Sequence, residues 1–235
     1  LSPGDSPGTL SMGSLVLQAG SVSRFEFNTP GVVGGLGPTG DDREQVAGNL
    51  TLNGTLAVVG TPAAGYYRLF NYGGTLSGSY GQVNAGTFTP TVLTNIPSQV
   101  NLSLLGPGQQ IQFWDGADAA GNGVVDGASG TWDAANTNWT GIPGQAGIND
   151  QWRSSVGVFA GSIGGTVTVQ GTQTFDTLQF STNGYSLVGG NLLAGPAVGT
   201  LNVDSGITVT IDTSIIGIGK SLAKVGNGAL VLTGA

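Results

Sequence analysis

Three aspartates near the middle of the chain are its best candidates for cation binding: Asp115, Asp118 and Asp126. They lie in a glycine-rich stretch, and hard cations such as Ca²⁺ take several oxygen ligands from such turns. However, the helix–loop–helix spacing of a calcium loop is not met, and no glutamate closes the loop. The alternative is a solvated acidic loop in which aspartate side chains accept hydrogen bonds from nearby backbone. The sequence favours this alternative, so we predict no metal ligands and keep calcium as the competing hypothesis.

Catalytic side chains are scarce, because the chain contains no histidine and no cysteine. This removes thiol nucleophiles, the usual zinc ligands and the imidazole base of a hydrolytic triad. The remaining acid/base device is a pair of converging carboxylates, for which the candidates are Asp204 with Asp212 and Asp41 with Asp42. Single aspartates at chain corners are commoner, because their side chains cap turns. We therefore predict no catalytic residues and no cofactor-binding residues.

Four tryptophans gather in the same middle region, at positions 114, 132, 139 and 152. Flat aromatic faces can stack on sugars or on a protein partner. Large aromatic side chains are nevertheless mostly buried in folded proteins. The sequence therefore favours tryptophans that fill an irregular part of the core.

Short strands must position all these residues. Apolar β-branched or aromatic residues alternate with polar ones in many short runs, which is typical of strands with one buried face. In the run 21–27, for example, Ser23, Phe25 and Phe27 share one face. Glycine, asparagine and aspartate stand between the runs and accept the backbone angles of tight corners. The main predicted strands are 14–17, 21–27, 49–52, 55–59, 66–70, 99–105, 155–159, 166–169, 174–180, 185–188, 200–203, 207–211 and 229–232.

Composition narrows the class of protein further. Glycine supplies 44 of 235 residues and charged residues only 8%, while 39% of residues are apolar, enough to bury a core. The net charge is -7 with six cationic side chains, so there is no basic stripe for phosphates and we predict no nucleic-acid partner. A cysteine-free acidic chain excludes a disulfide scaffold and fits export across a bacterial envelope. No apolar run is long enough to span a bilayer as a helix.

The fold class that best buries such strands is all-β, an elongated parallel β-helix, or β-solenoid. A β-sandwich also uses short strands, but it expects regular hairpins. In a solenoid each coil stacks its apolar positions on those of the next coil. The strand pattern is thin in the middle, so we predict solenoid segments over 1–105 and 156–235, with an irregular tryptophan-containing junction over 106–155. The chain is expected to be an excerpt of a longer repeat array.

Four stretches, at 1–10, 48–56, 130–139 and 222–234, resemble the autotransporter-associated β-strand repeats in the passenger regions of Gram-negative autotransporters. The last of them is the most specific, because it follows the pattern Lys-x-Gly-x-Gly-x-Leu-x-Leu-x-Gly of these passengers. The resemblance covers most of the chain. It implies a right-handed parallel β-helix displayed at the cell surface, tethered through a C-terminal outer-membrane barrel in the full-length protein.

The resemblance also implies a function, because members of the family are mostly adhesins, aggregation factors and biofilm factors. We therefore predict a non-enzymatic passenger segment that serves adhesion, autoaggregation or biofilm formation. Its predicted partners are further copies of itself, which would associate laterally, and a surface protein or glycan of unknown identity. Polysaccharide lyases and hydrolases also use parallel β-helices, so such an enzyme is the alternative, by analogy of fold alone.

Overall fold

The computed structural model describes residues 1–4, 7–30, 32, 40–94, 96–141 and 149–234. All regular structure in these ranges is β-strand, which confirms the predicted all-β class. A helix able to span a membrane is not found in them. The chain forms two compact units, the first made of Leu1–Thr94 with Ser98–Pro107, and the second of Asn95–Pro97 with Gly108–Ala235. The predicted junction over 106–155 stays a prediction, and its residues 142–148 lie outside the described ranges.

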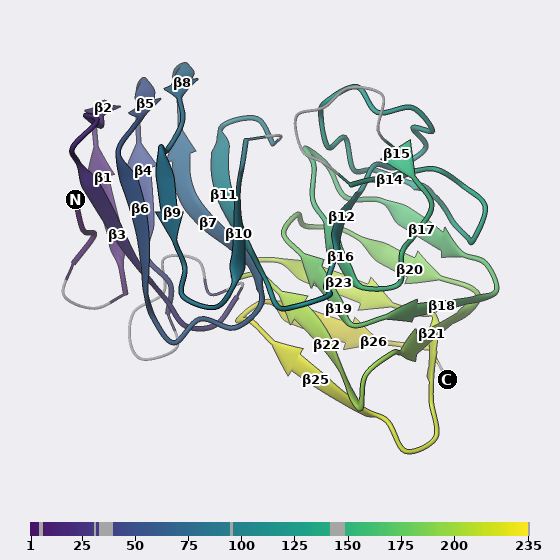
Figure 1. Ribbon diagram of the computed structural model, residues 1–235. Coiled ribbons are helices and arrows are strands. Elements are labelled where there is room, and N and C mark those ends of the chain that lie inside the picture. The colour runs from purple at the N-terminus through teal and green to yellow at the C-terminus, as the bar shows by residue number, and fades with distance from the viewer. Residues whose placement is uncertain (5–6, 31, 33–39, 95, 142–148, 235) are drawn as a thin grey trace. The chain divides into compact units, whose positions relative to one another are not determined.

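The first unit contains three successive coils, each of which contributes one strand to each of three sheets (Figure 1). Each strand pairs in parallel with the corresponding strand of the next coil, as predicted for a β-solenoid. The strands of the three coils are β1 (Thr9–Met12), β2 (Leu15–Val16) and β3 (Val22–Phe27), then β4 (Arg43–Val46), β5 (Leu50–Leu52) and β6 (Thr55–Gly60), then β7 (Gly65–Tyr72), β8 (Leu76–Gly78) and β9 (Gln82–Asn84).

In the sheet that contains β1, β4 and β7, parallel pairing ends at β7, because the neighbouring strand in that sheet runs in the opposite direction. β11 (Gln99–Leu105) pairs antiparallel with β7 on one side and with β10 (Thr89–Leu93) on the other. The link between β10 and β11 is far shorter than a parallel crossover requires, so the two strands form a hairpin. The expectation of parallel pairing throughout was therefore wrong at this position.

The second unit repeats the stacked-coil arrangement with a different beginning. Its first strands are β12 (Ile111–Trp114) and β13 (Gly130–Trp132). The short strand β14 (Trp139–Thr140) pairs antiparallel with β12, and β15 (Asn149–Asp150) pairs antiparallel with β14, so the expectation of parallel pairing is wrong here too. All later pairs in this unit are parallel. They join β16 (Val156–Phe159), β17 (Thr166–Val169), β18 (Thr172–Phe175), β19 (Thr177–Phe180), β20 (Ser186–Val188), β21 (Asn191–Ala194), β22 (Val198–Val203), β23 (Thr208–Ile211), β24 (Ser214–Ile216), β25 (Ser221–Val225) and β26 (Ala229–Leu232).

Alternation along the strands builds the core of each unit. In β23, Val209 and Ile211 are fully buried whereas Thr208 is exposed, as the pattern predicts. Equivalent positions stack from coil to coil, and the rings of Phe159 and Phe180 lie 4.7 Å apart at an interplanar angle of 9°. Burial of such stacked apolar side chains is the main stabilising contribution to each coil.

One predicted strand, 174–180, is divided in the structure. Its first part belongs to β18 and its second part to β19, with Asp176 at the break. The backbone N–H of Asp176 donates to the carbonyl of Ser155 at 2.9 Å, and its carboxylate accepts from the Ser155 hydroxyl at 3.2 Å. These two hydrogen bonds fix the corner between β18 and β19. The predicted single strand is therefore two strands that belong to different sheets.

Candidate functional site

The acidic loop follows β12 directly. Asp115 is the first residue after the strand, and its backbone N–H donates to the carbonyl of Asn138 at 3.0 Å. The N–H of Asp118 donates back to the carbonyl of Asp115 at 3.1 Å, which closes a turn. The chain then returns so that Asp126 lies beside this turn. One carboxylate oxygen from each of the three aspartates lies within 4.8 Å of the others.

Asp115 is the buried centre of this loop, with 1% of its surface exposed. Its Oδ1 accepts a hydrogen bond from the backbone N–H of Asp126 at 2.8 Å, and its Oδ2 accepts one from Nδ2 of Asn149 at 2.8 Å. Asn149 also donates to the carbonyl of Asp118 at 3.0 Å. Asn122 donates to the carboxylate of Asp126 at 2.9 Å. The sequence analysis did not single out Asn122 or Asn149. For Asn122, the Asn-Gly pair typical of a tight turn was a usable signal, and for Asn149 there was none.

Burial and close carboxylates set the ionisation of this loop. Burial raises the pKa of Asp115, although the hydrogen bonds from Asn149 and Asp126 oppose the rise. A side-chain hydrogen bond with Asp126 raises the pKa of Asp118.

The donor set of this loop is small for a hard cation. Calcium takes about 6–8 oxygen ligands. The described residues bring together three carboxylates, and both oxygens of Asp115 already accept hydrogen bonds within the loop. The hydrogen bonds to Asp115 thus support the interpretation as a hydrogen-bonded loop, and the expectation that no metal binds here stays a prediction.

The four tryptophans form one cluster inside the second unit, which confirms the prediction that they fill the core. Trp139 is fully buried, and its ring lies 5.4 Å from Trp114, 5.2 Å from Trp132 and 4.4 Å from Trp152. The indole N–H of Trp114 donates to the carbonyl of Ala128 at 2.9 Å, and that of Trp152 to the carbonyl of Thr174 at 2.7 Å. These rings therefore present no open face for sugar stacking.

The two candidate carboxylate pairs serve structural contacts. Asp204 accepts from Nε2 of Gln179 at 3.0 Å, and the exposed Asp212 accepts from the hydroxyl of Thr233 at 2.9 Å. In the first unit, the buried Asp41 and Asp42 accept hydrogen bonds from backbone N–H groups, at 2.7–2.9 Å. Each carboxylate thus ties one stretch of chain to another, the usual use of a buried acid.

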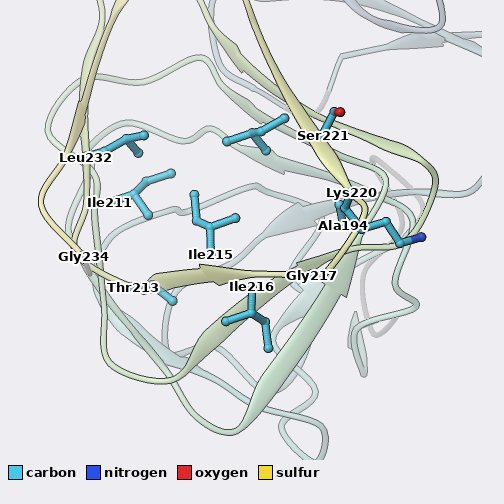
Figure 2. A pocket seen from close by; sticks show the side chains of 11 residues that line it. Ala194, Ile211, Thr213, Ile215, Ile216, Gly217, Lys220, Ser221, Leu232 and Gly234 are labelled. Carbon is cyan, nitrogen blue, oxygen red and sulfur yellow. The ribbon is translucent and has the colours of Figure 1, made fainter.

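A hollow of about 320 Å³ lies against the last coil of the second unit (Figure 2). Ile211, Ile215 and Leu232 are among the residues that line it. Ile216 lines it as well, although its side chain lies on the other side of β24 from that of Ile215. The amino group of Lys220 at its rim donates to the carbonyl of Gly195 at 2.8 Å. A ligand site needs convergent polar groups in such a cavity, and the lining here is mainly aliphatic. The hollow is therefore best described as a solvent-accessible part of the apolar core and not as a ligand site.

One outer surface of the second unit is uncharged and rich in hydroxyl groups. It is formed by the outward side chains of β13, β17, β20, β23 and β26, strands that contain no charged residue. Thr166 pairs with Ser186, which pairs with Thr210 in the next coil, so hydroxyls stand in a column about 4.8 Å apart. We call this surface the hydroxyl face; its hydroxyl residues are Thr131, Thr166, Thr168, Ser186, Thr208 and Thr210.

Comparison with known proteins supplies one informative relative. The chain is 37% identical to the adhesin BmaC autotransporter of Brucella suis biovar 1 (strain 1330), in an alignment of 256 residues that includes all of this chain. The chain spans 7% of the length of that relative. No family model matches the chain. No solved structure matches it either.

Similarity over the full chain agrees with the four repeat-like stretches and with the stacked parallel strands of both units. It confirms the resemblance and the location predicted from it. The chain is a segment of an autotransporter passenger, and its place is at the cell surface, outside the outer membrane.

Proposed function

We propose that this chain is a non-enzymatic adhesive segment of its passenger. The observation that carries the proposal is the 37% identity, over the whole chain, to a protein named as an adhesin. We further propose that the full-length protein is tethered by a C-terminal outer-membrane barrel, and that the coils are right-handed and build an elongated rod. Adhesion then requires no deep pocket, because many weak contacts repeated along a rigid surface add up.

The partner we propose is a second copy of the same segment, which makes the function autoaggregation and, through it, biofilm formation. The hydroxyl face supports this choice, because a chain with a net charge of -7 repels its copy wherever acidic side chains meet. Exposed Thr166, Thr168 and Thr208 offer donors and acceptors to an identical surface without that repulsion. Contacts that are weak singly hold cells together when many copies act at high effective concentration.

The test displays the full passenger on cells and measures clumping by sedimentation. Thr168→Asp with Thr208→Asp places two negative charges on the hydroxyl face, and we expect clumping to fall by about tenfold or more. Ser79→Asp with Gln82→Asp adds the same charge at exposed positions of the first unit and should leave clumping unchanged.

Deletion of residues 161–235 should weaken clumping without blocking export. Surface display must be verified by antibody labelling for every variant. Unchanged clumping after this deletion, with display intact, would assign the segment a spacer role.

A further inference from the structure

The first unit buries a carboxyl group among apolar side chains. In β4, Glu44 and Val46 point inward while Arg43 and Gln45 are only half-buried, so strand alternation places Glu44 in the core. Its exposed fraction is 0%, and its neighbours in the sheet are Leu10 and Phe70. Among the described residues, none donates a hydrogen bond to either of its carboxylate oxygens.

Two buried hydroxyl groups share this environment. Ser23 points inward from β3 with an exposed fraction of 0%, and the hydroxyl oxygen of Tyr80, between β8 and β9, is buried as well. Burial raises the pKa of the Tyr80 phenol, the nearby Ser23 hydroxyl opposes this rise, and the Glu44 carboxylate adds to it. Neither hydroxyl has a hydrogen-bond partner of good geometry among the described residues. The three groups come from three successive coils, so a change at Glu44 affects contacts between all three.

The charges near Glu44 do not compensate its own. Burial raises the pKa of Glu44 to about 8, and the nearby Asp42 carboxylate adds to this rise. The ionised form is thus a buried charge without a hydrogen bond, which is strongly destabilising. The protonated form is a neutral acid, whose burial costs much less, and its O–H can donate to a hydroxyl oxygen.

We propose that Glu44, together with Ser23 and Tyr80, is a proton-dependent switch in the first unit: the neutral acid is part of the core, and its ionisation loosens the coils. The direction follows from the two states. The unfolded chain ionises this group near its ordinary value of 4.5, and the folded chain does so only near 8. Stability is therefore complete below the lower value, is lost as pH rises between the two, and stays low above the higher one.

Hydrogen exchange of peptides from each unit, corrected for the intrinsic pH dependence, tests the switch in the intact chain. We expect protection in the first unit to fall by up to about tenfold per pH unit between about pH 5 and pH 8, while the second unit serves as the internal reference. Glu44→Gln should remove this slope, and Glu26→Gln, a matched change on β3, should retain it.

The proposal is overturned if the first unit is protected equally at all these pH values, or if Glu44→Gln keeps the full slope. Should Glu44→Gln fail to fold, two further measurements decide. Glu44→Leu keeps similar volume without a polar group and should give a pH-independent first unit. Infrared spectra of the unsubstituted chain should show the C=O stretch of a protonated carboxyl at neutral pH, and its absence would also overturn the proposal.

Discussion

The two units differ in one buried carboxyl group although both are built of stacked parallel coils. The first unit holds the hydrogen-bonded acids Asp41 and Asp42, but it also holds one buried acid without hydrogen-bond donors. In the second unit, Asp115 and Asp204 are buried but accept hydrogen bonds from Asn149 and Gln179. In the first unit, Glu44 is more deeply buried and its oxygens lack such donors. A hydrogen-bonded acid can remain charged inside a protein, whereas an acid without donors is tolerated mainly as the neutral form. Stacked coils can therefore bury a carboxylate that stays ionised through its hydrogen bonds, and also a carboxyl group that is tolerated mainly when protonated.

The aromatic content of the two cores differs as well. All four tryptophans lie in the second unit, and Trp114, Trp132 and Trp139 pack against Phe159. The first unit relies on smaller rings, with Phe25 5.8 Å from Phe27 and 5.4 Å from Phe70. Tryptophan fluorescence therefore reports on the second unit alone, which lets the units be followed separately.

The largest expected effect is on the tryptophan cluster. Trp139→Ala should lower the free energy of unfolding of the second unit by about 3–5 kcal/mol, because it removes a fully buried ring that touches four others. Urea denaturation followed by fluorescence of the remaining tryptophans measures this loss. Protection from hydrogen exchange in the first unit serves as the control and should not change. A loss below about 1 kcal/mol would show that the cluster is not a packed core.

A smaller difference is expected between two glycine corners, one in each unit. Gly54 has φ +75°, and a Cβ there would lie 2.3 Å from the carbonyl oxygen of Ser21. Gly171 has φ +67° but no atom within 4 Å of such a Cβ. Gly171→Ala should therefore cost about 1–2 kcal/mol for the left-handed backbone alone, and Gly54→Ala roughly 1–3 kcal/mol more for the added clash.

Thermal unfolding of the two glycine variants, each compared with the unsubstituted chain, measures both costs. Equal losses would mean that the corner at Gly54 opens to admit a methyl group. In that case the coils of the first unit would be looser than their backbone contacts indicate.

The smallest expected effect is that of a chelator. Melting curves of the second unit in calcium chloride and in EDTA should coincide, because the carboxylate of Asp115 is already satisfied by Asp126 and Asn149. Tryptophan fluorescence supplies the melting curve. A lower melting temperature in EDTA that disappears in Asp118→Asn would establish a calcium site in this loop and reverse the prediction.

Most strands could be predicted from the sequence, because alternation of apolar and polar residues is a local property. The run 99–105 matches β11, and Ser23, Phe25 and Phe27 do share the buried face of β3. Very short strands such as β8 and β24 were missed, since two or three residues carry too little alternation to be distinguished from a corner. The acidic loop was found from its aspartates, but its donor Asn149 comes from a distant strand that no spacing rule connects to it.

The sequence by itself determined the local elements of this protein. These are strands with one apolar face, glycine-rich corners, and the repeat-like stretches that resemble those of autotransporter passengers. Only the tertiary structure decided which strand pairs with which, and that β11 turns antiparallel against β7. It also decided that, among the described residues, Glu44 rather than any acid considered from the sequence is buried without hydrogen-bond donors. The reason is physical: solvation and hydrogen bonding depend on neighbours in space, and stacked coils assemble those neighbours from residues far apart in the chain.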